Sequence, residues 1–515
     1  MIAAAGRLVA RITRPSATHR GGRGPARLLP ACSLAACYLA AAILVRLAMY
    51  GKPAVQVDEQ FYLLVGQRMA QGALPYVDLW DRKPYGLFLI YRAVFLVPLD
   101  PVLVYQALGT ACSVLTALVI ARTARLVAPE RGARLAGLAY LLYQPTFNVA
   151  LGQSPVFYNL PVALAALAVV RAGQRQRDRR LALRGCGVML LIGLAMQIKY
   201  TALFEGAGLG LLLLARGRAD GWSPPRLAAT AALWAGLALA PTLAVLAGYV
   251  LAGHGEAFVQ ANFLSIFGRR TDWADAFAQL AKETLAMLPF ALAILLAPRR
   301  LSLRGGEVPD ALMPLRIWAG FALGGFLLIA PWYDHYLGPV LVPLCVLCAP
   351  VLGHGRPGGR WHANVLLGFG LIGAVAAPAF QLRERGTAAE FSQATALVQR
   401  ELKHPKHAPH RCLYVYEGDS ALYRTTGACI PTRFAFPSHL DAMNEAGALG
   451  VDPVAEVRRI MASRPGVVVM AESGRPNLPN LRTRAFMRRT LARGYERYAG
   501  ITLGTRKFGL YRPRR

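Results

Sequence analysis

Long apolar blocks separated by short, arginine-rich connectors fill the first three quarters of this 515-residue chain. A block of about 18 or more apolar residues can cross a bilayer as a helix, because its backbone groups then hydrogen-bond within the segment. We predict about eleven crossings, near 28–50, 103–126, 132–150, 155–170, 183–198, 201–215, 226–252, 284–298, 313–331, 335–353 and 362–380. With 55% hydrophobic and 17% charged residues, the composition excludes an ordinary soluble protein.

The charge of each connector predicts its side, because Lys and Arg are retained in cytoplasmic loops. Basic connectors alternate with connectors of low charge; the basic ones are 122–134, 171–184, 216–226, 299–316 and 354–361. The apolar segment 86–98 is short for a crossing, and a crossing there would invert this rule. We therefore interpret it as an interfacial or re-entrant helix.

This alternation predicts a membrane domain over 28–380 with a basic cytoplasmic N-terminus, 1–27. A cleaved signal peptide is the alternative for the first apolar run, but its long basic flank favours a signal anchor. The segments 51–102 and 253–283 become outside loops. The C-terminal region then also lies outside the cytoplasm.

Two function classes are disfavoured by the sequence. The formal charge of +31 is spread over the connectors rather than forming one basic stripe with interleaved aromatic residues, which argues against nucleic-acid binding. A transporter or lipid flippase is disfavoured because we find no internal repeat and no charged residue buried in the middle of a predicted helix.

The C-terminal region, 384–515, has the periodicity of a soluble domain. Segments 413–416 and 466–470 are predicted to be short buried strands. Segment 452–462 is predicted to be an amphipathic helix with Asp452 as N-cap. The alternation indicates a small soluble α/β domain. Cys412 and Cys429 lie here and are disulfide candidates if the domain is outside the cytoplasm, whereas Cys345 and Cys348 are interpreted as membrane packing residues.

The first outside loop, 51–102, concentrates ionisable residues: Asp58, Glu59, Asp78, Asp81, Arg82 and Lys83. The adjacent Asp58 and Glu59 can supply a general base, and Arg82 and Lys83 can hold an anionic lipid headgroup. The alternative is a loop whose charges simply remain in water.

Three motifs in this loop carry a resemblance: DE-x2-Y from Asp58, G-x2-PY-x-D from Gly72, and D-x-KP from Asp81. In this order after the first helix they resemble the polytopic GT-C glycosyltransferases of the aminoarabinose and protein-mannosyl transferase type, with the Rgt-like bacterial enzymes. Gly193-Leu194-Ala195-x3-Lys199 and Asp334-His335-Tyr336-Leu337 resemble later landmarks of that superfamily. The resemblance covers nearly the whole chain.

The resemblance implies inverting transfer of a hexose or pentose from a polyprenyl-phosphate donor to a lipid, glycan or protein acceptor. The reaction would occur on the outer face of a bacterial inner membrane, with the C-terminal domain in the periplasm. Asp58, beside Glu59, would deprotonate the acceptor hydroxyl, while Lys83 and Lys199 would stabilise the departing phosphate. Further candidates for substrate binding are Asp78, Asp81, Arg82, Asn159, His335 and Tyr336.

No cofactor and no metal ligand are required by this chemistry, although a divalent metal between Asp58 and the donor phosphate is an alternative. Lys199 could instead snorkel to the membrane interface, and His335 and Tyr336 could pack at a helix start.

One departure from the family stands near 153–159, where relatives often carry an acidic residue and this chain has Gln153 and Asn159. A catalytically degenerate protein that keeps the fold for lipid binding or assembly is therefore the alternative function.

Overall fold

The computed structural model describes residues 29–54, 56–175, 178–295, 312–353, 357–404, 411–472 and 478–514. The predicted basic N-terminus, 1–27, and parts of the connectors 171–184, 299–316 and 354–361 lie outside the described residues. The chain forms two compact units. The first takes its described residues from 1–48, 106–242 and 278–377, and the second from 49–105, 243–277 and 378–515.

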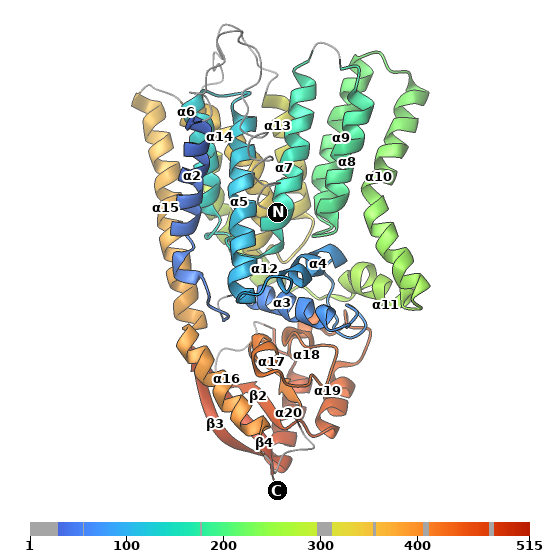
Figure 1. Ribbon diagram of the computed structural model, residues 1–515, viewed down its shortest axis with the longest axis vertical. Helices are drawn as coiled ribbons and strands as arrows, with labels where there is room; N and C mark the ends of the chain where they lie inside the picture. Colours follow the sequence, from blue (N-terminus) through green and yellow to red (C-terminus); the bar gives the residue numbers. More distant parts are fainter. Residues whose placement is uncertain are drawn as a thin grey trace. The chain divides into compact units, whose positions relative to one another are not determined.

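Each of the eleven predicted apolar blocks overlaps an α-helix, and in Figure 1 the helices of the first unit run side by side. They are α2 (Leu29–Leu44), α5 (Pro101–Ala124), α6 (Glu130–Tyr143), α7 (Ser154–Gly173), α8 (Leu181–Met196), α9 (Ala202–Ala219), α10 (Pro224–Leu251), α12 (Trp273–Leu295), α13 (Met313–Leu327), α14 (Gly338–Leu352) and α15 (Pro357–Arg385). The parts of α5, α10, α12 and α15 beyond the bounds given above belong to the second unit.

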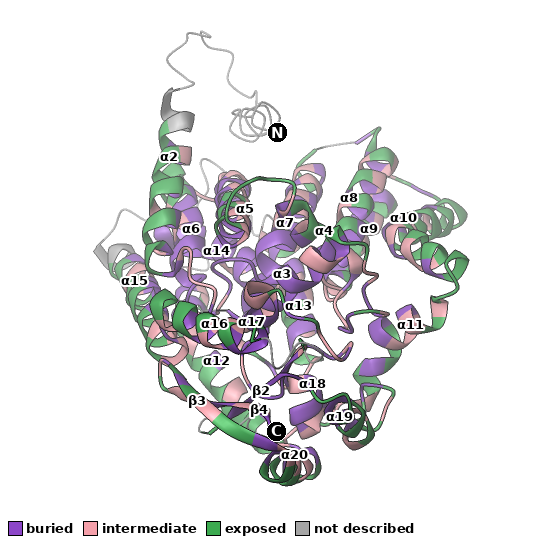
Figure 2. Cartoon of the chain, turned by 60° about the horizontal axis from the view of Figure 1, so that its bottom comes forward, coloured by how far each residue is buried: buried purple, intermediate pink, exposed green. Residues whose placement is uncertain are grey.

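Within the described residues, six segments are long and apolar enough to cross a membrane: α5, α7, α10, α12, Asp334–Leu352 and Trp361–Leu402. Helices α8 and α13 are apolar but shorter. These segments make the chain an integral membrane protein, while a total of eleven crossings stays a prediction. Figure 2 shows that α10 exposes most of its surface, as a lipid-facing helix would.

Small residues let the helices of the first unit approach closely. A Cβ atom on Gly132 of α6 would lie 2.0 Å from the carbonyl oxygen of Ala349 in α14. The fully buried Arg46 follows α2, and its guanidinium donates to the carbonyl oxygens of Ala42 and Ala150 and to the side chain of Gln144. A buried charge is tolerated only when it is paired in this way.

In the second unit, α3 (Val57–Ala70) packs against α4 (Tyr85–Val94), which contains most of the short apolar segment 86–98. The contact is close because a Cβ atom on Gly66 would lie 2.5 Å from the backbone of Tyr91. Only ten residues of α4 are helical, too few to span a bilayer core about 30 Å thick at 1.5 Å per residue.

The predicted outside loop 253–283 contains short helical segments. It contains α11 (Gly255–Val259), a π-helical turn (Gln260–Leu264) and a 3₁₀ turn (Ser265–Gly268). Helix α12 begins at Trp273 rather than near 284, because Asp272 accepts hydrogen bonds from the N–H groups of Ala274 (3.1 Å) and Asp275 (3.3 Å) and so caps the helix there.

The C-terminal part contains a four-stranded sheet in the order β1-β2-β4-β3. The strands are β1 (Leu413–Val415), β2 (Val467–Ala471), β3 (Tyr495–Leu503) and β4 (Arg506–Pro513). Strands β1 and β2 are parallel, with Leu413 opposite Val467, whereas β4 pairs antiparallel with both β2 and β3. The predicted small α/β sheet is thus present, with two strands that the sequence did not indicate.

Helices surround this sheet. They are α16 (Ala388–Leu402), α17 (Ala421–Thr426), α18 (Ser438–Asp441), α19 (Pro453–Ala462) and α20 (Leu481–Gly494). Helix α19 begins as predicted: Asp452 accepts a hydrogen bond from the N–H of Val454 at 3.1 Å, with Pro453 in the first helical position.

Candidate active site

Asp58 and Glu59 occupy the first turn of α3, where unpaired backbone N–H groups favour negative charge. Their side chains differ in access. Glu59 is fully buried, with 0% exposure, whereas Asp58 is partly exposed. Of the two predicted carboxylates, only Asp58 can meet a substrate without rearrangement of α3.

Asp81 and Lys83 belong to the same electrostatic cluster as Asp58. Asp81 is buried and accepts a hydrogen bond from the N–H of Arg82 at 2.6 Å. Burial raises the pKa of Asp81, the charges of Lys83 and Arg82 act to lower it, and the charge of Asp58 raises it further. The first loop therefore places Asp81 in electrostatic contact with both Asp58 and Lys83.

The ammonium group of Lys83 faces the ring of Tyr62, with its nitrogen 5.7 Å from the ring centroid. Within the described residues, Lys83 makes no ion pair. The backbone of Lys83 is fixed, since its carbonyl oxygen accepts a hydrogen bond from the hydroxyl of Tyr76 at 2.8 Å. A cation whose backbone is held in place and whose ammonium group makes no direct ion pair is suited to receive an anionic ligand.

Arg82 occupies a different environment from the one expected for a phosphate ligand. Both of its terminal nitrogens contact the carboxylate of Glu445, which also pairs with Arg269 at 3.0 Å. Burial opposes ionisation of Glu445, but the two guanidinium charges outweigh it and lower its pKa to about 2. Arg82 therefore fastens the first loop to the C-terminal residues of the second unit.

An aromatic cluster completes this attachment. The ring of His439 lies 4.7 Å from that of Trp80 and 5.3 Å from that of Phe436, centroid to centroid. The backbone N–H of Trp80 donates a hydrogen bond to the backbone carbonyl oxygen of Arg433 at 2.8 Å. Burial lowers the pKa of His439 to about 3, so the imidazole is neutral at neutral pH. Sequence reasoning missed His439, Glu445 and Arg269, because no local motif marks them.

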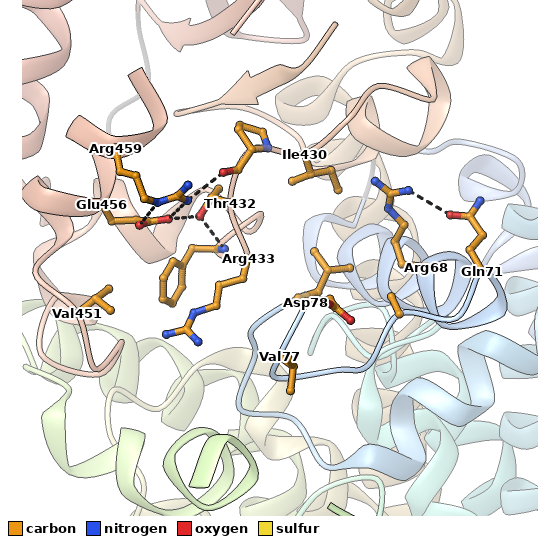
Figure 3. Close-up of a pocket in the computed structure, with 14 residues that line it drawn as sticks. Arg68, Gln71, Val77, Asp78, Ile430, Thr432, Arg433, Val451, Glu456 and Arg459 are labelled. Atoms are coloured by element: carbon orange, nitrogen blue, oxygen red, sulfur yellow. Dashed lines mark hydrogen bonds and ion pairs between the residues drawn. The ribbon is translucent and has the colours of Figure 1, made fainter. Parts of the chain in front are cut away.

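Asp78 closes the turn that precedes this attachment. Its carboxylate accepts a hydrogen bond from the N–H of Leu74 at 2.7 Å, and the turn contains Tyr76 at φ +68°. Asp78 is exposed and lines an open pocket with Arg68 and Arg433, shown in Figure 3. Its geometry gives it a structural role in the turn together with access to solvent.

In the first unit, Lys199 and Tyr336 lie together. The Lys199 ammonium nitrogen is 4.0 Å from the centroid of the Tyr336 ring, and both residues line a small cavity of about 60 Å³ with Glu205. The Glu205 carboxylate accepts a hydrogen bond from the indole N–H of Trp318 at 2.8 Å. The two predicted residues Lys199 and Tyr336 are thus brought together, and Glu205 joins them.

One expectation is corrected by Glu283, which is 2% exposed in the middle of α12, so the expectation that no charged residue is buried mid-helix was wrong. Glu205 is also 2% exposed, in the first turn of α9. The acidic residue in the apolar segment 201–215 was visible in the sequence and would have marked this place.

His335 and Asn159 are the remaining predicted residues of the first unit. The His335 backbone N–H and ring nitrogen Nδ1 contact Asp334 at 2.7 and 3.3 Å. Asn159 is 1% exposed, and its amide donates to the carbonyl oxygen of Gly338 at 3.0 Å and to the hydroxyl of Tyr140 at 3.3 Å. Asn159 therefore ties α7 to α14 and α6.

The cysteines divide as their environments suggested. Cys412 and Cys429 are joined by a disulfide, whereas Cys345 and Cys348 are free and buried in α14. Among the described residues, no group of three or more His, Cys, Asp or Glu side chains is arranged to hold a metal ion.

The apolar helices and the small mixed sheet define the class, a polytopic membrane protein, and solved structures of similar fold support the GT-C fold that the motifs predicted. The particular likeness is to ArnT from Cupriavidus metallidurans. With ArnT bound to undecaprenyl phosphate, the match covers 93% of this chain and 98% of that chain, at 14% identity and a TM-score of 0.59. With apo ArnT, the identity is 15% and the TM-score 0.60.

The apo oligosaccharyltransferase of Archaeoglobus fulgidus is also similar. The match covers 85% of this chain and 69% of that chain, at 12% identity and a TM-score of 0.50. Neither a protein-family model nor a curated protein sequence matches the chain significantly. The shared property is therefore the fold.

Proposed function

We propose that the chain is an integral-membrane glycosyltransferase that moves a sugar from a polyprenyl-phosphate-linked donor to a lipid, glycan or protein acceptor on the outer face of the membrane. The observation that carries this proposal is the cluster of Asp58, Asp81 and Lys83 in a chain with the fold of ArnT. The ArnT structure with bound undecaprenyl phosphate supports the class of donor.

In the proposed reaction, Asp58 takes the proton of the acceptor hydroxyl while that oxygen attacks the anomeric carbon of the donor sugar. The bond between the anomeric carbon and the phosphate oxygen breaks, and its electron pair leaves on the polyprenyl phosphate. Attack from the face opposite the phosphate inverts the anomeric configuration. The acceptor gains the sugar and Asp58 holds the proton.

The lysines stabilise the charge that develops on the leaving phosphate. Lys83 is the principal candidate because its ammonium group makes no direct ion pair among the described residues. Lys199, over the ring of Tyr336 in the first unit, stays a phosphate-binding candidate on the resemblance alone. Asp81 acts as a positioning residue, since its charge interacts with both Lys83 and Asp58.

A second candidate function is supported by the segment 153–159. Gln153 caps α7 by accepting a hydrogen bond from the N–H of Ser154 at 3.3 Å. The side chain of Asn159 donates a hydrogen bond to the carbonyl oxygen of Gly338 in α14. Neither side chain is acidic, whereas the resemblance drawn from the sequence implies an acidic residue near this place. A degenerate protein that binds polyprenyl phosphate without transferring sugar would fit this departure.

Transfer of radiolabelled sugar from membrane-extracted polyprenyl-phosphate donors by the purified full chain distinguishes the two. We expect label in the acceptor with wild type, and none above background with Asp58→Asn or Lys83→Ala. Asp275→Asn, an exposed carboxylate in the first turn of α12, is the matched control and should transfer normally. Donor binding without transfer by wild type would favour the degenerate protein.

A further inference from the structure

An open pocket of about 590 Å³ in the second unit has no part in the reaction described above. Its lining comes from the end of α3, the turn 73–79, the segment 430–434 and the residues around α19 (Figure 3). We propose that this pocket binds an acidic saccharide, a sugar carrying a carboxylate or phosphate, as part of the acceptor. The inference rests on the proposed function and extends it to the class of acceptor.

The cationic groups of the pocket are only partly neutralised. Arg459 is committed to Glu456, with nitrogen Nη2 2.6 Å from oxygen Oε1, and Glu456 also accepts from the hydroxyl of Thr432 at 2.6 Å. Arg433 contacts the ring of Phe434 at 4.9 Å from its centroid and makes no ion pair within the described residues. Arg68 donates one hydrogen bond, to the side chain of Gln71 at 3.1 Å.

Arg433 and Arg68 therefore keep unused N–H donors that face solvent within the pocket. A guanidinium presents paired N–H groups in a fixed plane, which match the two oxygens of a carboxylate or phosphate. Figure 3 draws the two guanidinium groups apart, so the anionic group of the ligand belongs beside Arg433, and Arg68 remains available to another part of the saccharide.

The rest of the lining is suited to a sugar ring. Leu79, Ile430 and Phe434 supply apolar walls, and Gln71 and Asp78 supply polar groups able to bind hydroxyls. A saccharide has apolar C–H faces and a polar rim, so it needs both kinds of surface. The volume falls within the range of about 300–1,000 Å³ typical of small-molecule sites.

The position of the pocket along α3 links it to the acceptor rather than to the leaving phosphate. Asp58 lies in the first turn of this helix and Arg68 in its last turn. Ten residues of α-helix correspond to about 15 Å at 1.5 Å per residue. A saccharide acceptor with its reacting hydroxyl at Asp58 can place a sugar further along its chain in the pocket.

The test is direct binding to the purified full chain in detergent, measured by microscale thermophoresis without any donor. The probes are glucuronic acid, glucose 6-phosphate, glucose and inorganic phosphate. We expect one of the two acidic sugars to bind with a Kd at least about tenfold below those of glucose and inorganic phosphate, because charge-assisted hydrogen bonds add to the sugar contacts. The preferred probe identifies carboxylate or phosphate as the recognised group.

Arg433→Gln should weaken binding of the preferred acidic sugar by about tenfold or more. Arg458→Gln is the matched control, since Arg458 adjoins Arg459 on α19 but lies outside the pocket lining. Equal binding of glucose and the acidic sugars would overturn the proposal. So would equally tight binding of inorganic phosphate, or an unchanged Kd in Arg433→Gln.

The two proposals fail separately. The binding measurement needs no donor. Binding of an acidic sugar by a chain that transfers no sugar would therefore support the proposed binding pocket and contradict the proposed glycosyltransferase function. Normal sugar transfer by a chain that does not bind the acidic sugars would support the proposed glycosyltransferase function and contradict the proposed binding pocket.

Discussion

At the scale of single residues, neighbours in the sequence have separate tasks. Asp58 is partly exposed and Glu59 is fully buried, although both stand in the first turn of α3. Arg82 and Lys83 differ in the same way, because Glu445 neutralises Arg82, whereas Lys83 faces the ring of Tyr62 and makes no direct ion pair among the described residues. The environment of each side chain, rather than its type, assigns its role.

His439 gives a prediction for the dependence of stability on pH. Its pKa is about 3 in the folded chain and about 6.5 in an unfolded chain. Between these values the unfolded state binds more protons, so stability falls as the pH is lowered from about 6.5 toward 3. The slope approaches about 1.4 kcal/mol per pH unit.

The measurement is thermal unfolding of wild type and His439→Phe from pH 7.5 to 5. We expect the stability of His439→Phe to depend less on pH than that of wild type, because phenylalanine fits the aromatic cluster and does not titrate. His254→Gln, at an exposed histidine, should keep the wild-type slope. Parallel curves for wild type and His439→Phe would contradict the prediction.

At the scale of elements, the contact between α3 and α4 fixes the loop that carries the candidate base. Gly66 makes this contact close, because a Cβ atom there would lie 2.5 Å from the carbonyl carbon and 2.7 Å from the carbonyl oxygen of Tyr91. Backbone atoms cannot move aside as a flexible side chain can. The spacing of the two helices therefore depends on glycine at this position.

Gly66→Ala is expected to destabilise the chain by about 1–3 kcal/mol, the usual cost of forcing extra volume into a packed contact. The control is Gly187→Ala, at an exposed helical glycine where a Cβ atom meets nothing within 4 Å. That substitution should be neutral or stabilising, since alanine favours helix. Midpoints of unfolding in detergent compare the two; equal midpoints would show that α3 and α4 do not depend on the glycine.

Sequence reasoning predicted elements where the pattern is local. The apolar blocks, the strand at 467–471 and the N-cap Asp452 all depend on residues near one another in the chain. Strand β3 was missed because it lies at the sheet edge and carries Glu496 and Arg497, which interrupt an apolar pattern. The pair Arg82–Glu445 joins residues 363 positions apart, and no local pattern contains such a contact.

At the scale of the whole molecule, the distribution of charge predicts an outside C-terminal region. Basic connectors alternate with connectors of low charge along the membrane part. The disulfide between Cys412 and Cys429 is consistent with an oxidising compartment. Both observations favour the periplasmic or extracellular side for the residues that surround the sheet.

A fusion of alkaline phosphatase to the C-terminus tests this topology, because that enzyme needs its own disulfides and is active only outside the bacterial cytoplasm. We expect an active phosphatase fusion and a dark fusion to green fluorescent protein at the same position. A fluorescent fusion with inactive phosphatase would place the C-terminal region in the cytoplasm and contradict the account of the loop as an outer-face site.

The central claim is that Asp58 acts as the base in sugar transfer. The most direct measurement compares wild type and Asp58→Asn in one preparation each, for both undecaprenyl phosphate binding and sugar transfer. The account predicts an unchanged Kd for the lipid and a loss of about 10²- to 10⁴-fold in the transfer rate, the usual contribution of a general base. Transfer by Asp58→Asn at the wild-type rate would contradict the account.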